Sequence, residues 1–275
     1  MKIDGKKLAE KVLSEIRTEL RGLPQITLAI VTLGQEDAWE HYVSQKIKLA
    51  SELGALTELI NIKDPTEEKL IEIIKKLNKD PKITGIIVQR PLTKHIKKDK
   101  VIYAVSPGKD IDGFIKNSHF KPPVWLAVKD ILSEIAKIEG LNLSKFLKDR
   151  TITVIGKGET AGQPVIDGLK KLDAEPNVVD SKTENSGEII KSSDIIISAV
   201  GKSEVFATRN LKNGVTIIGI GLHRQNGKLK PDFDEEKVSK TAKYYSPTPG
   251  GVGPLNLAYL FKNLVLAAKL PIDES

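Results

Sequence analysis

The sequence predicts an α/β protein of two domains, each built around a parallel sheet, with a cleft between them. Short apolar runs typical of buried strands alternate with stretches of helical periodicity, and this alternation is typical of parallel strands joined by right-handed crossovers. A loop-rich segment at residues 93–123 interrupts the alternation, which then resumes. The length of 275 residues also suits two domains, on an expectation of about 150 residues each.

The first half of the chain is expected to form a helix followed by a β-α-β-α-β unit. Gly54 ends the second helix, acidic residues in the first turn of the third helix favour its dipole, and Pro91 breaks the third strand. We expect helices at residues 3–20, 37–54 and 66–80, and strands at residues 25–34, 56–62 and 83–92.

The second half begins with an amphipathic helix and then returns to the β-α alternation. We expect helices at residues 124–138, from about Gln163, at 186–194 and at 255–270, and strands at 151–156, 175–180, 194–201 and 215–221. Residues 244–254 are rich in glycine and proline, so we expect neither a helix nor a central strand there.

Composition excludes several kinds of site. The absence of cysteine excludes disulfides and thiolate chemistry, and the four histidines show no metal-ligand spacing, so no metal is expected. The net charge of +7 is spread among acidic residues with only 5% aromatics, which favours small anionic ligands over nucleic acid. No apolar run reaches the roughly 20 residues of a membrane helix, so we expect a cytoplasmic protein with no membrane partner.

A glycine-rich loop follows the first strand of the second half. Gly156, Gly158 and Gly162 have the spacing G-x-G-x-x-x-G, and Gln163 and Pro164 follow in the first turn of the expected helix. Such a loop lets backbone N–H groups approach a pyrophosphate at a helix N-terminus. The alternative is a tight turn with glycines for packing. The order of strand, loop and helix favours a Rossmann-type dinucleotide-binding domain.

The end of the next strand gives conflicting signals about which nicotinamide cofactor binds. Asp180 there suits the free 2′-hydroxyl of NAD, whereas Ser181, Lys182 and Thr183 suit the 2′-phosphate of NADP. Gly201 lies in the segment "SAVGK", which we expect to pass beneath the cofactor.

Tyr42 and Lys46 are four residues apart in an expected helix and therefore share one face. The alternative is a tyrosine that packs by its ring and a lysine in water. A Tyr-x-x-x-Lys pair also occurs in short-chain dehydrogenases, but there it follows the glycine loop, whereas here Gly156 comes 110 residues after Lys46. The pair therefore belongs to a separate, substrate-carrying domain.

Three other segments collect polar residues or glycines in loops or at strand ends. Gln89 lies toward the carboxyl end of the expected strand at residues 83–92, the end where open parallel sheets bind ligands. Asp110 and Asp112 lie in a glycine-flanked turn, where capping their own loop is an equal alternative. The third segment is the proline- and glycine-rich stretch at residues 247–254.

Together these segments resemble one family in order and in detail. Residues 42–48 resemble its Y-V-x-x-K-x-K helix, 85–92 its G-[IL]-[IL]-V-Q-x-P-L strand, 107–114 its P-x-K-D-V-D-G-[FL] loop, and 247–254 its P-V-P-G-G-V-G-P loop. The chain is thereby similar to the bifunctional methylenetetrahydrofolate dehydrogenase/cyclohydrolase family, from about Lys2 to the final helix.

The resemblance implies a catalytic domain of residues 1–123 with 255–275, a Rossmann NADP-binding domain of residues 124–254, folate in the cleft and a homodimer. It implies hydride transfer from 5,10-methylenetetrahydrofolate to NADP, then hydrolysis of 5,10-methenyltetrahydrofolate to 10-formyltetrahydrofolate. The implied catalytic set is Lys46 as the catalyst of hydrolysis, Gln89 tuning it, and Tyr42 and Asp112, which also bind folate. Substrate contacts are further expected from Pro249, Gly250 and Gly251.

The cofactor side departs from the family pattern. Gly156-Lys157-Gly158 stands where G-R-S is usual, and Lys157 keeps a charge but not a bidentate fork. We expect NADP, with NAD as the alternative. The expected cofactor-binding residues are Gly156, Lys157, Gly158, Gly162, Gln163, Pro164, Ser181, Lys182 and Gly201. The competing functions are a monofunctional NAD-dependent methylenetetrahydrofolate dehydrogenase and a non-catalytic folate- or nucleotide-binding protein.

Overall fold

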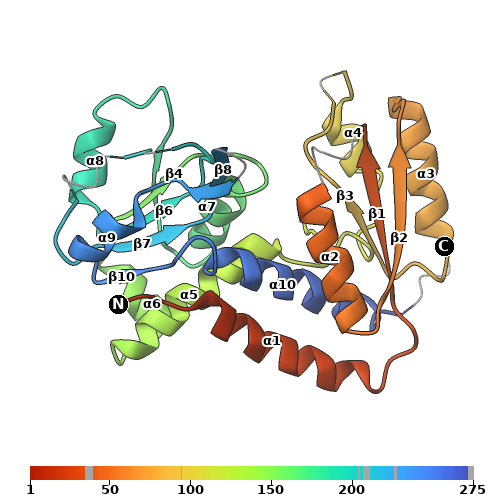
Figure 1. Ribbon diagram of the computed structural model, residues 1–275, viewed down its shortest axis with the longest axis horizontal. Coiled ribbons are helices and arrows are strands. Elements are labelled where there is room, and N and C mark those ends of the chain that lie inside the picture. The colour runs from red at the N-terminus through yellow and green to blue at the C-terminus, as the bar shows by residue number, and fades with distance from the viewer. Residues whose placement is uncertain (35–39, 94, 204, 207–210, 226–227, 272–275) are drawn as a thin grey trace. The chain divides into compact units, whose positions relative to one another are not determined.

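The computed structural model describes residues 1–34, 40–93, 95–203, 205–206, 211–225 and 228–271, and within it the chain forms two compact units (Figure 1). The three-stranded unit comprises Val12–Pro123 and Leu260–Ser275, and the five-stranded unit comprises Met1–Lys11 and Val124–Tyr259. The division falls inside α1 (Gly5–Leu20) and α10 (Val252–Ala267), so each unit contains segments from both halves of the sequence.

The three-stranded unit contains a parallel sheet in the order β2-β1-β3, which confirms the predicted β-α-β-α-β pattern. Its strands are β1 (Thr27–Leu33), β2 (Leu56–Ile62) and β3 (Gly85–Val88). They are followed in turn by α2 (Glu40–Glu52), α3 (Glu67–Lys79) and α4 (Lys98–Ile102). β1 is central and buried along its whole length, because its apolar residues are enclosed by a strand on each side.

The two faces of this sheet pack against different helices. Alternate residues of β1, such as Val31, point into a core shared with α3 and α4, and Leu70 and Ile74 of α3 are fully buried there. On the opposite face, Gly85 approaches α10 so closely that a Cβ at position 85 would lie 2.8 Å from Leu264 Cδ1. The sheet is therefore covered on both faces, as parallel sheets require.

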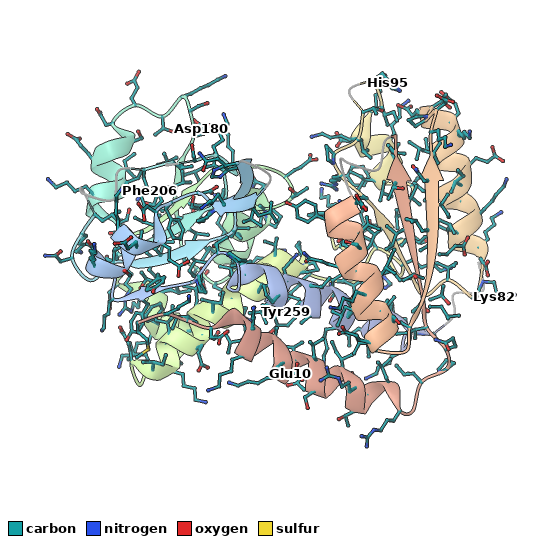
Figure 2. The ribbon with its side chains drawn as sticks, in the orientation of Figure 1. Glu10, Lys82, His95, Asp180, Phe206 and Tyr259 are labelled. Atoms are coloured by element: carbon teal, nitrogen blue, oxygen red, sulfur yellow. The ribbon has the colours of Figure 1, made fainter. Side chains whose placement is uncertain are left out.

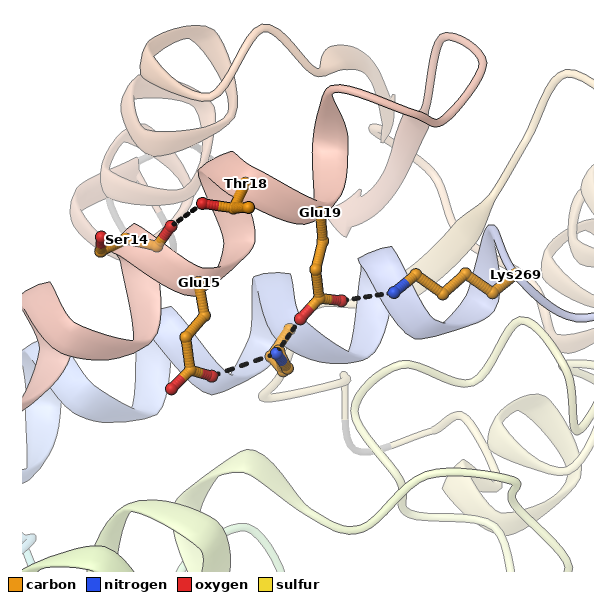
Figure 3. Close-up of polar contacts among 6 residues, drawn as sticks. Ser14, Glu15, Thr18, Glu19 and Lys269 are labelled. Carbon is orange, nitrogen blue, oxygen red and sulfur yellow. Dashed lines mark hydrogen bonds and ion pairs between the residues drawn. The ribbon is translucent and has the colours of Figure 1, made fainter.

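Ion pairs join the parts of α1 and α10 that belong to the three-stranded unit (Figure 3). Glu19 pairs with Lys262 and with Lys269, whose Nζ lies 2.5 Å from Glu19 Oε2, and Lys262 also lies 3.2 Å from Glu15. Hydrogen bonds from both lysines lower the pKa of Glu19. This network connects two helices that are more than 200 residues apart in the sequence.

The five-stranded unit contains a parallel sheet in the order β10-β7-β6-β4-β5. Its strands are β4 (Ile152–Ile155), β5 (Asn177–Val179), β6 (Ile195–Ser198), β7 (Thr216–Gly219) and β10 (Tyr244–Tyr245). The helices are α5 (Pro123–Ile138), α6 (Leu143–Lys148), α7 (Gly162–Lys170), α8 (Ser186–Ser192) and α9 (Glu235–Thr241). An antiparallel hairpin of β8 (Leu222–Gln225) and β9 (Lys228–Pro231) follows β7.

The N-terminal residues extend this sheet past β10. Ile3 N donates to Tyr245 O at 2.8 Å, and Tyr245 N donates to Met1 O at 3.0 Å, which places Lys2 opposite Tyr245 in a parallel bridge. The predicted helix at residues 3–20 therefore begins two residues later, at Gly5, because Lys2 and Ile3 pair with the sheet instead.

The closing segment also differs from the expectation. α10 begins at Val252, so the last three residues of the proline- and glycine-rich stretch form its first turn, where Pro254 lacks an N–H without cost. Helices α4, α6 and α9, the hairpin and the two-residue β10 are short and were not predicted. Among the described residues, no helix is long and apolar enough to cross a membrane.

Candidate functional site

A lysine and a glutamine from separate elements meet in the three-stranded unit. Lys46 lies in the middle of α2, and Gln89 directly follows β3, where its backbone N donates to Val31 O at 2.8 Å. Lys46 Nζ donates to Gln89 Oε1 at 2.7 Å. Gln89 Nε2 donates to Arg90 O at 2.8 Å, and this bond orients the amide so that its oxygen faces the lysine. The structure thus brings Lys46 and Gln89 into direct contact, and their roles remain predictions.

Burial changes the proton affinity of the charged groups in this cluster. Desolvation lowers the pKa of Lys46, although the charge of Asp112 opposes that change. Desolvation raises the pKa of Asp112, against the charges of Lys46 and Arg90. The Arg90 guanidinium in turn lies 4.1 Å from the centre of the Phe114 ring. The cluster thus holds a lysine with a lowered pKa beside a carboxyl group with a raised pKa and a fixed amide.

The two aspartates of the 107–114 loop behave differently. Asp110 is buried and accepts from Ile115 N at 3.0 Å through Oδ2, so it caps its own loop, as the alternative interpretation held. Burial raises its pKa to about 7. Asp112 is half-buried, and its charge interacts with Lys46.

Tyr42 lies one helical turn before Lys46 on α2, and 45% of its surface is exposed. The tyrosine ring is therefore accessible to a ligand near Lys46 rather than buried in the core, as the packing alternative required.

In the five-stranded unit, the strand order reverses between β4 and β6, because the chain goes from β4 to β5 on one side and then to β6 on the other. Ligands of open α/β sheets bind at this switch point, outside the carboxyl ends of the strands. The glycine loop leaves β4 at this place. Gly156 N donates to Val179 O and Ala199 N to Ile155 O, both at 2.8 Å, so the loops after β4 and β6 lie side by side.

The three glycines of the loop have different steric environments. A Cβ at Gly162 would lie 1.9 Å from Gly156 O, and a Cβ at Gly156 would lie 2.8 Å from Ala199 O, so the fold itself excludes side chains at both positions. Gly158 faces open space, with no atom within 4 Å of such a Cβ. The absence of a side chain at Gly158 therefore leaves room for a ligand, and the loop fits a pyrophosphate at the N-terminus of α7.

The residues at the start of α7 contribute in different ways. Gln163 N donates to Gly158 O at 3.0 Å and closes the loop, while its side-chain Nε2 donates to Asp167 at 2.8 Å. Pro164 lies in the first turn, as expected. The side chain of Gln163 is thus engaged with its own helix.

Asp180 is engaged by its neighbours in the loop after β5 (Figure 2). Its Oδ2 lies 2.8 Å from Lys157 Nζ, and its Oδ1 accepts from Lys182 N at 2.9 Å and from Thr183 Oγ1 at 3.1 Å. The hydrogen bond from Lys157 is the main reason that the pKa of Asp180 falls to about 2. The side chains of Ser181 and Lys182 are exposed beside it.

Gly201 and the 249–251 segment also belong to the five-stranded unit. Gly201 lies in the loop after β6 and has φ +71°. Gly250 has φ +108°, and Gly251 O packs against α1, where a Cβ at Gly5 would lie 1.9 Å from it. Pro249 to Gly251 thus belong to the five-stranded unit, whereas Lys46 belongs to the three-stranded unit.

No group of three or more metal-ligating side chains was found in the described part of the chain. Two polar residues of the sites were not predicted. Arg90 lies in the 85–92 segment, but no role was expected for it. Asp232 binds the loop after β6 and belongs to none of the sequence motifs described above.

The five-stranded unit has a glycine loop at the switch point of a parallel sheet, and the other unit has the cluster around Lys46. Together these features define a two-unit dinucleotide-dependent enzyme. Two family models match the chain: "Tetrahydrofolate dehydrogenase/cyclohydrolase, catalytic domain" over residues 3–112 and "Tetrahydrofolate dehydrogenase/cyclohydrolase, NAD(P)-binding domain" over residues 136–271. The chain belongs to the tetrahydrofolate dehydrogenase/cyclohydrolase family, which confirms the resemblance found in the sequence.

Individual relatives cover nearly the whole chain. The bifunctional protein FolD of Acetivibrio thermocellus is 36% identical, and the match covers 98% of this chain and 96% of that protein. The structure of the bifunctional methylenetetrahydrofolate dehydrogenase/cyclohydrolase of Campylobacter jejuni is similar with a TM-score of 0.88 at 30% identity, covering 98% of each chain. The Trypanosoma brucei enzyme, solved with NADP and an inhibitor, has a TM-score of 0.86 at 27% identity, covering 98% of this chain and 97% of that one.

Proposed function

We propose that this protein oxidises 5,10-methylenetetrahydrofolate to 5,10-methenyltetrahydrofolate with NADP and hydrolyses the product to 10-formyltetrahydrofolate. The observation that carries the proposal is the hydrogen bond of 2.7 Å from Lys46 to Gln89 in a partly desolvated cluster, within a chain of this family. We keep the domains that the family resemblance implies: residues 1–123 with 255–275 bind folate, and residues 124–254 bind NADP.

Lys46 is the acid–base group of the hydrolysis in this proposal. Because burial lowers its pKa, Lys46 gives up its proton more readily than a lysine in water, and the lone pair of the neutral amine can take a proton from the water that attacks the methenyl carbon. Gln89 Oε1 holds one N–H of the amine and so directs the lone pair away from the glutamine. The resulting ammonium then returns the proton to the folate nitrogen that leaves as the ring opens, while the hydroxyl on the former methenyl carbon loses its own proton to solvent and becomes the formyl carbonyl.

Asp112 and Tyr42 position the folate. Asp112 binds the pterin, and its raised pKa is consistent with a carboxyl group that shares a proton with a ligand rather than with solvent. Tyr42 is exposed on the same helix face as Lys46 and provides a ring for the folate to pack on. Pro249, Gly250 and Gly251 provide backbone contacts to the substrate.

The dehydrogenase step needs alignment rather than an acid or a base, because the folate nitrogen stabilises the cation that forms. When bound, NADP accepts the hydride from the folate carbon. Gly156, Gly158 and Gly162 form the pyrophosphate loop, with Gln163 and Pro164 at the helix start and Gly201 beneath the cofactor. Lys157, Ser181 and Lys182 provide cation and hydroxyl groups for the 2′-phosphate.

The protein is further proposed to act in the cytoplasm as a homodimer. In the described part of the chain, β2 pairs only with β1, so one of its edges is open, and Leu56 and Leu59 on this strand are 55% and 43% exposed. An open strand edge with exposed leucines favours pairing with a second copy of the chain.

Two assays test this function. NADP-dependent formation of methenyltetrahydrofolate is followed by its near-ultraviolet absorbance, with NAD as the comparison, and the decay of that absorbance then measures hydrolysis. We expect both activities and a preference for NADP. The variant Lys46→Met should abolish the enzymatic decay, and Lys48→Met, an exposed lysine on the same helix, should retain it. Wild-type hydrolysis in Lys46→Met would remove Lys46 from its role, and the absence of both activities in the wild type would refute the function.

A further inference from the structure

The loop Ser198–Lys202 leaves β6 at the switch point and touches the glycine loop directly. A Cβ at Gly156 would lie 2.8 Å from Ala199 O and 3.1 Å from Val200 Cγ2. Any displacement of Ser198–Lys202 would therefore also move the glycine loop, because the two backbones are already in contact.

A single buried carboxylate holds this loop. Asp232 is fully buried, and its Oδ2 accepts from Ser198 Oγ at 2.7 Å and from Val200 N at 2.9 Å. Its Oδ1 accepts from Gly201 N at 2.8 Å and from Lys202 N at 3.2 Å. Three successive backbone N–H groups thus converge on one carboxylate, in the geometry of an anion-binding nest.

The surroundings hold the carboxylate in one place. A Cβ at Gly221 would lie only 2.1 Å from Asp232 Oδ2, so the backbone of the β7–β8 connection packs directly against the carboxylate. Asp232 O also accepts from Val205 N at 3.0 Å, and the ring of Phe233 lies 5.9 Å from that of Phe206 (labelled in Figure 2). Asp232 therefore binds the chain on both sides of the loop, through its carboxylate at residues 198–202 and through its backbone carbonyl at Val205.

This arrangement determines which groups the loop can offer to a ligand. Because the N–H groups of Val200, Gly201 and Lys202 are used by Asp232, the backbone there can offer a ligand only carbonyl acceptors. Carbonyl acceptors suit the ribose hydroxyls and the carboxamide of a nicotinamide nucleotide and disfavour a phosphate. The pyrophosphate is left to the glycine loop and the N-terminus of α7.

We propose that Asp232 is a positioning residue for the dinucleotide: its carboxylate occupies the N–H groups of Val200, Gly201 and Lys202 and fixes the loop in the conformation that receives the nicotinamide half of the cofactor. The inference rests on the proposed function and assigns a role in cofactor binding to a residue of the five-stranded unit that belongs to no predicted site. Asp232 does not touch the reacting atoms, so its loss should affect cofactor affinity and spare hydrolysis.

The variant Asp232→Asn tests the role, since it places an amide donor where the loop presents donors. In the full-length protein, calorimetry measures the dissociation constant of NADP, and steady-state assays measure KM for NADP, kcat and the hydrolysis rate without cofactor. We expect the dissociation constant and KM for NADP to rise at least about tenfold, with kcat at saturating NADP and the hydrolysis rate near the wild-type values. Asp234→Asn, at the exposed N-cap of α9 two residues later, is the matched control and should bind NADP as the wild type does.

The outcomes separate the two proposals. Wild-type NADP affinity in a well-folded Asp232→Asn overturns the positioning role alone, whereas a wild-type protein without NADP binding or hydrolysis overturns the proposed function. If Asp232→Asn loses hydrolysis through misfolding, Gly221→Ala decides, because its methyl group must displace the carboxylate, and unchanged NADP affinity in that variant overturns the role. Hydrogen exchange on the wild type adds a measurement without substitution: the amides of residues 200–202 should exchange slowly, and free exchange would contradict the contacts.

Discussion

The carboxylate of Asp180 binds residues of its own turn and also Lys157 of the neighbouring glycine loop. In the sequence it favours NAD, because a free aspartate at the end of this strand accepts from the ribose 2′-hydroxyl. In the structure it accepts from Lys182 N and Thr183 Oγ1 and pairs with Lys157, so it is not a free acceptor. With a pKa of about 2 it is charged at every physiological pH, and it competes with a 2′-phosphate for Lys157.

Replacing this carboxylate should therefore improve the use of NADP. The variant Asp180→Ser releases Lys157 and removes a negative charge, and we expect kcat/KM for NADP to rise by about five- to tenfold while that for NAD falls or stays constant. Steady-state rates with both cofactors measure the change. Asp167→Ser, on α7 and engaged only by Gln163 in the contacts described, is the control for removal of a nearby carboxylate. A shift of preference toward NAD would contradict the role of Lys157.

At the residue level, a contact could be predicted from the sequence where both side chains belong to a recognisable motif. The helix of Lys46 and the strand that leads to Gln89 are predicted by their periodicity, and the resemblance to the family implied that Gln89 acts on Lys46, which its hydrogen bond now contacts. Asp232 has three backbone partners and one serine, and backbone N–H groups carry no sequence pattern, so nothing marked it. The roles assigned to the site residues remain predictions.

At the scale of elements, long helices and buried strands were predicted and short elements were not. β2 and α3 agree with the expected ranges to within a residue because uninterrupted periodicity defines them. β10 has two residues and α4 has five, so neither gives a periodic pattern, and both depend on neighbours that are distant in the sequence. α10 begins earlier than expected because Pro254 is compatible with the first turn of a helix, although proline inside a segment usually indicates that no helix forms there.

The ion pairs between α1 and α10 give an element-scale prediction. Glu19 has its pKa lowered by Lys262 and Lys269, so its contribution to stability is fully present above the unfolded pKa and is lost as the pH falls through the folded pKa. We expect Glu19→Gln to lower the free energy of unfolding by about 1 kcal/mol at pH 7 and by less at pH 3.

Denaturant unfolding at both pH values measures this difference. Glu15→Gln is the control. The Glu15 side chain is 65% exposed and makes one contact of 3.2 Å to Lys262 in the network described, so this variant should leave the free energy of unfolding almost unchanged. An equal loss for Glu19→Gln at pH 3 and pH 7 would show that packing rather than charge is responsible.

At the scale of the whole molecule, β2 predicts the oligomeric state. The wild-type protein should sediment at about twice the chain mass of 30.2 kDa, and Leu59→Lys should raise the dimer dissociation constant at least about tenfold by burying a charge at the strand edge. Analytical ultracentrifugation over a range of concentrations measures both. Tyr103→Lys changes another exposed hydrophobic residue, at the end of α4, and should leave the dimer intact. A monomeric wild type, or an unaffected Leu59→Lys, would rule out this edge.

The dependence of the three-stranded unit on α10 has a consequence for the order of synthesis. Asn263 Nδ2 donates to Ile111 O and Lys121 O at 2.9 and 3.0 Å, and Leu264 packs on Gly85, so part of the core of this unit comes from α10, which is translated long after its strands. The strands of this sheet end at Val88, so they must wait until about 175 later residues have been translated, roughly ten seconds or more at typical rates of synthesis. A nascent chain stalled before residue 260 should thus expose the apolar surface of this sheet to chaperones, and Asn263 would not yet be present to bind Ile111, the residue before Asp112.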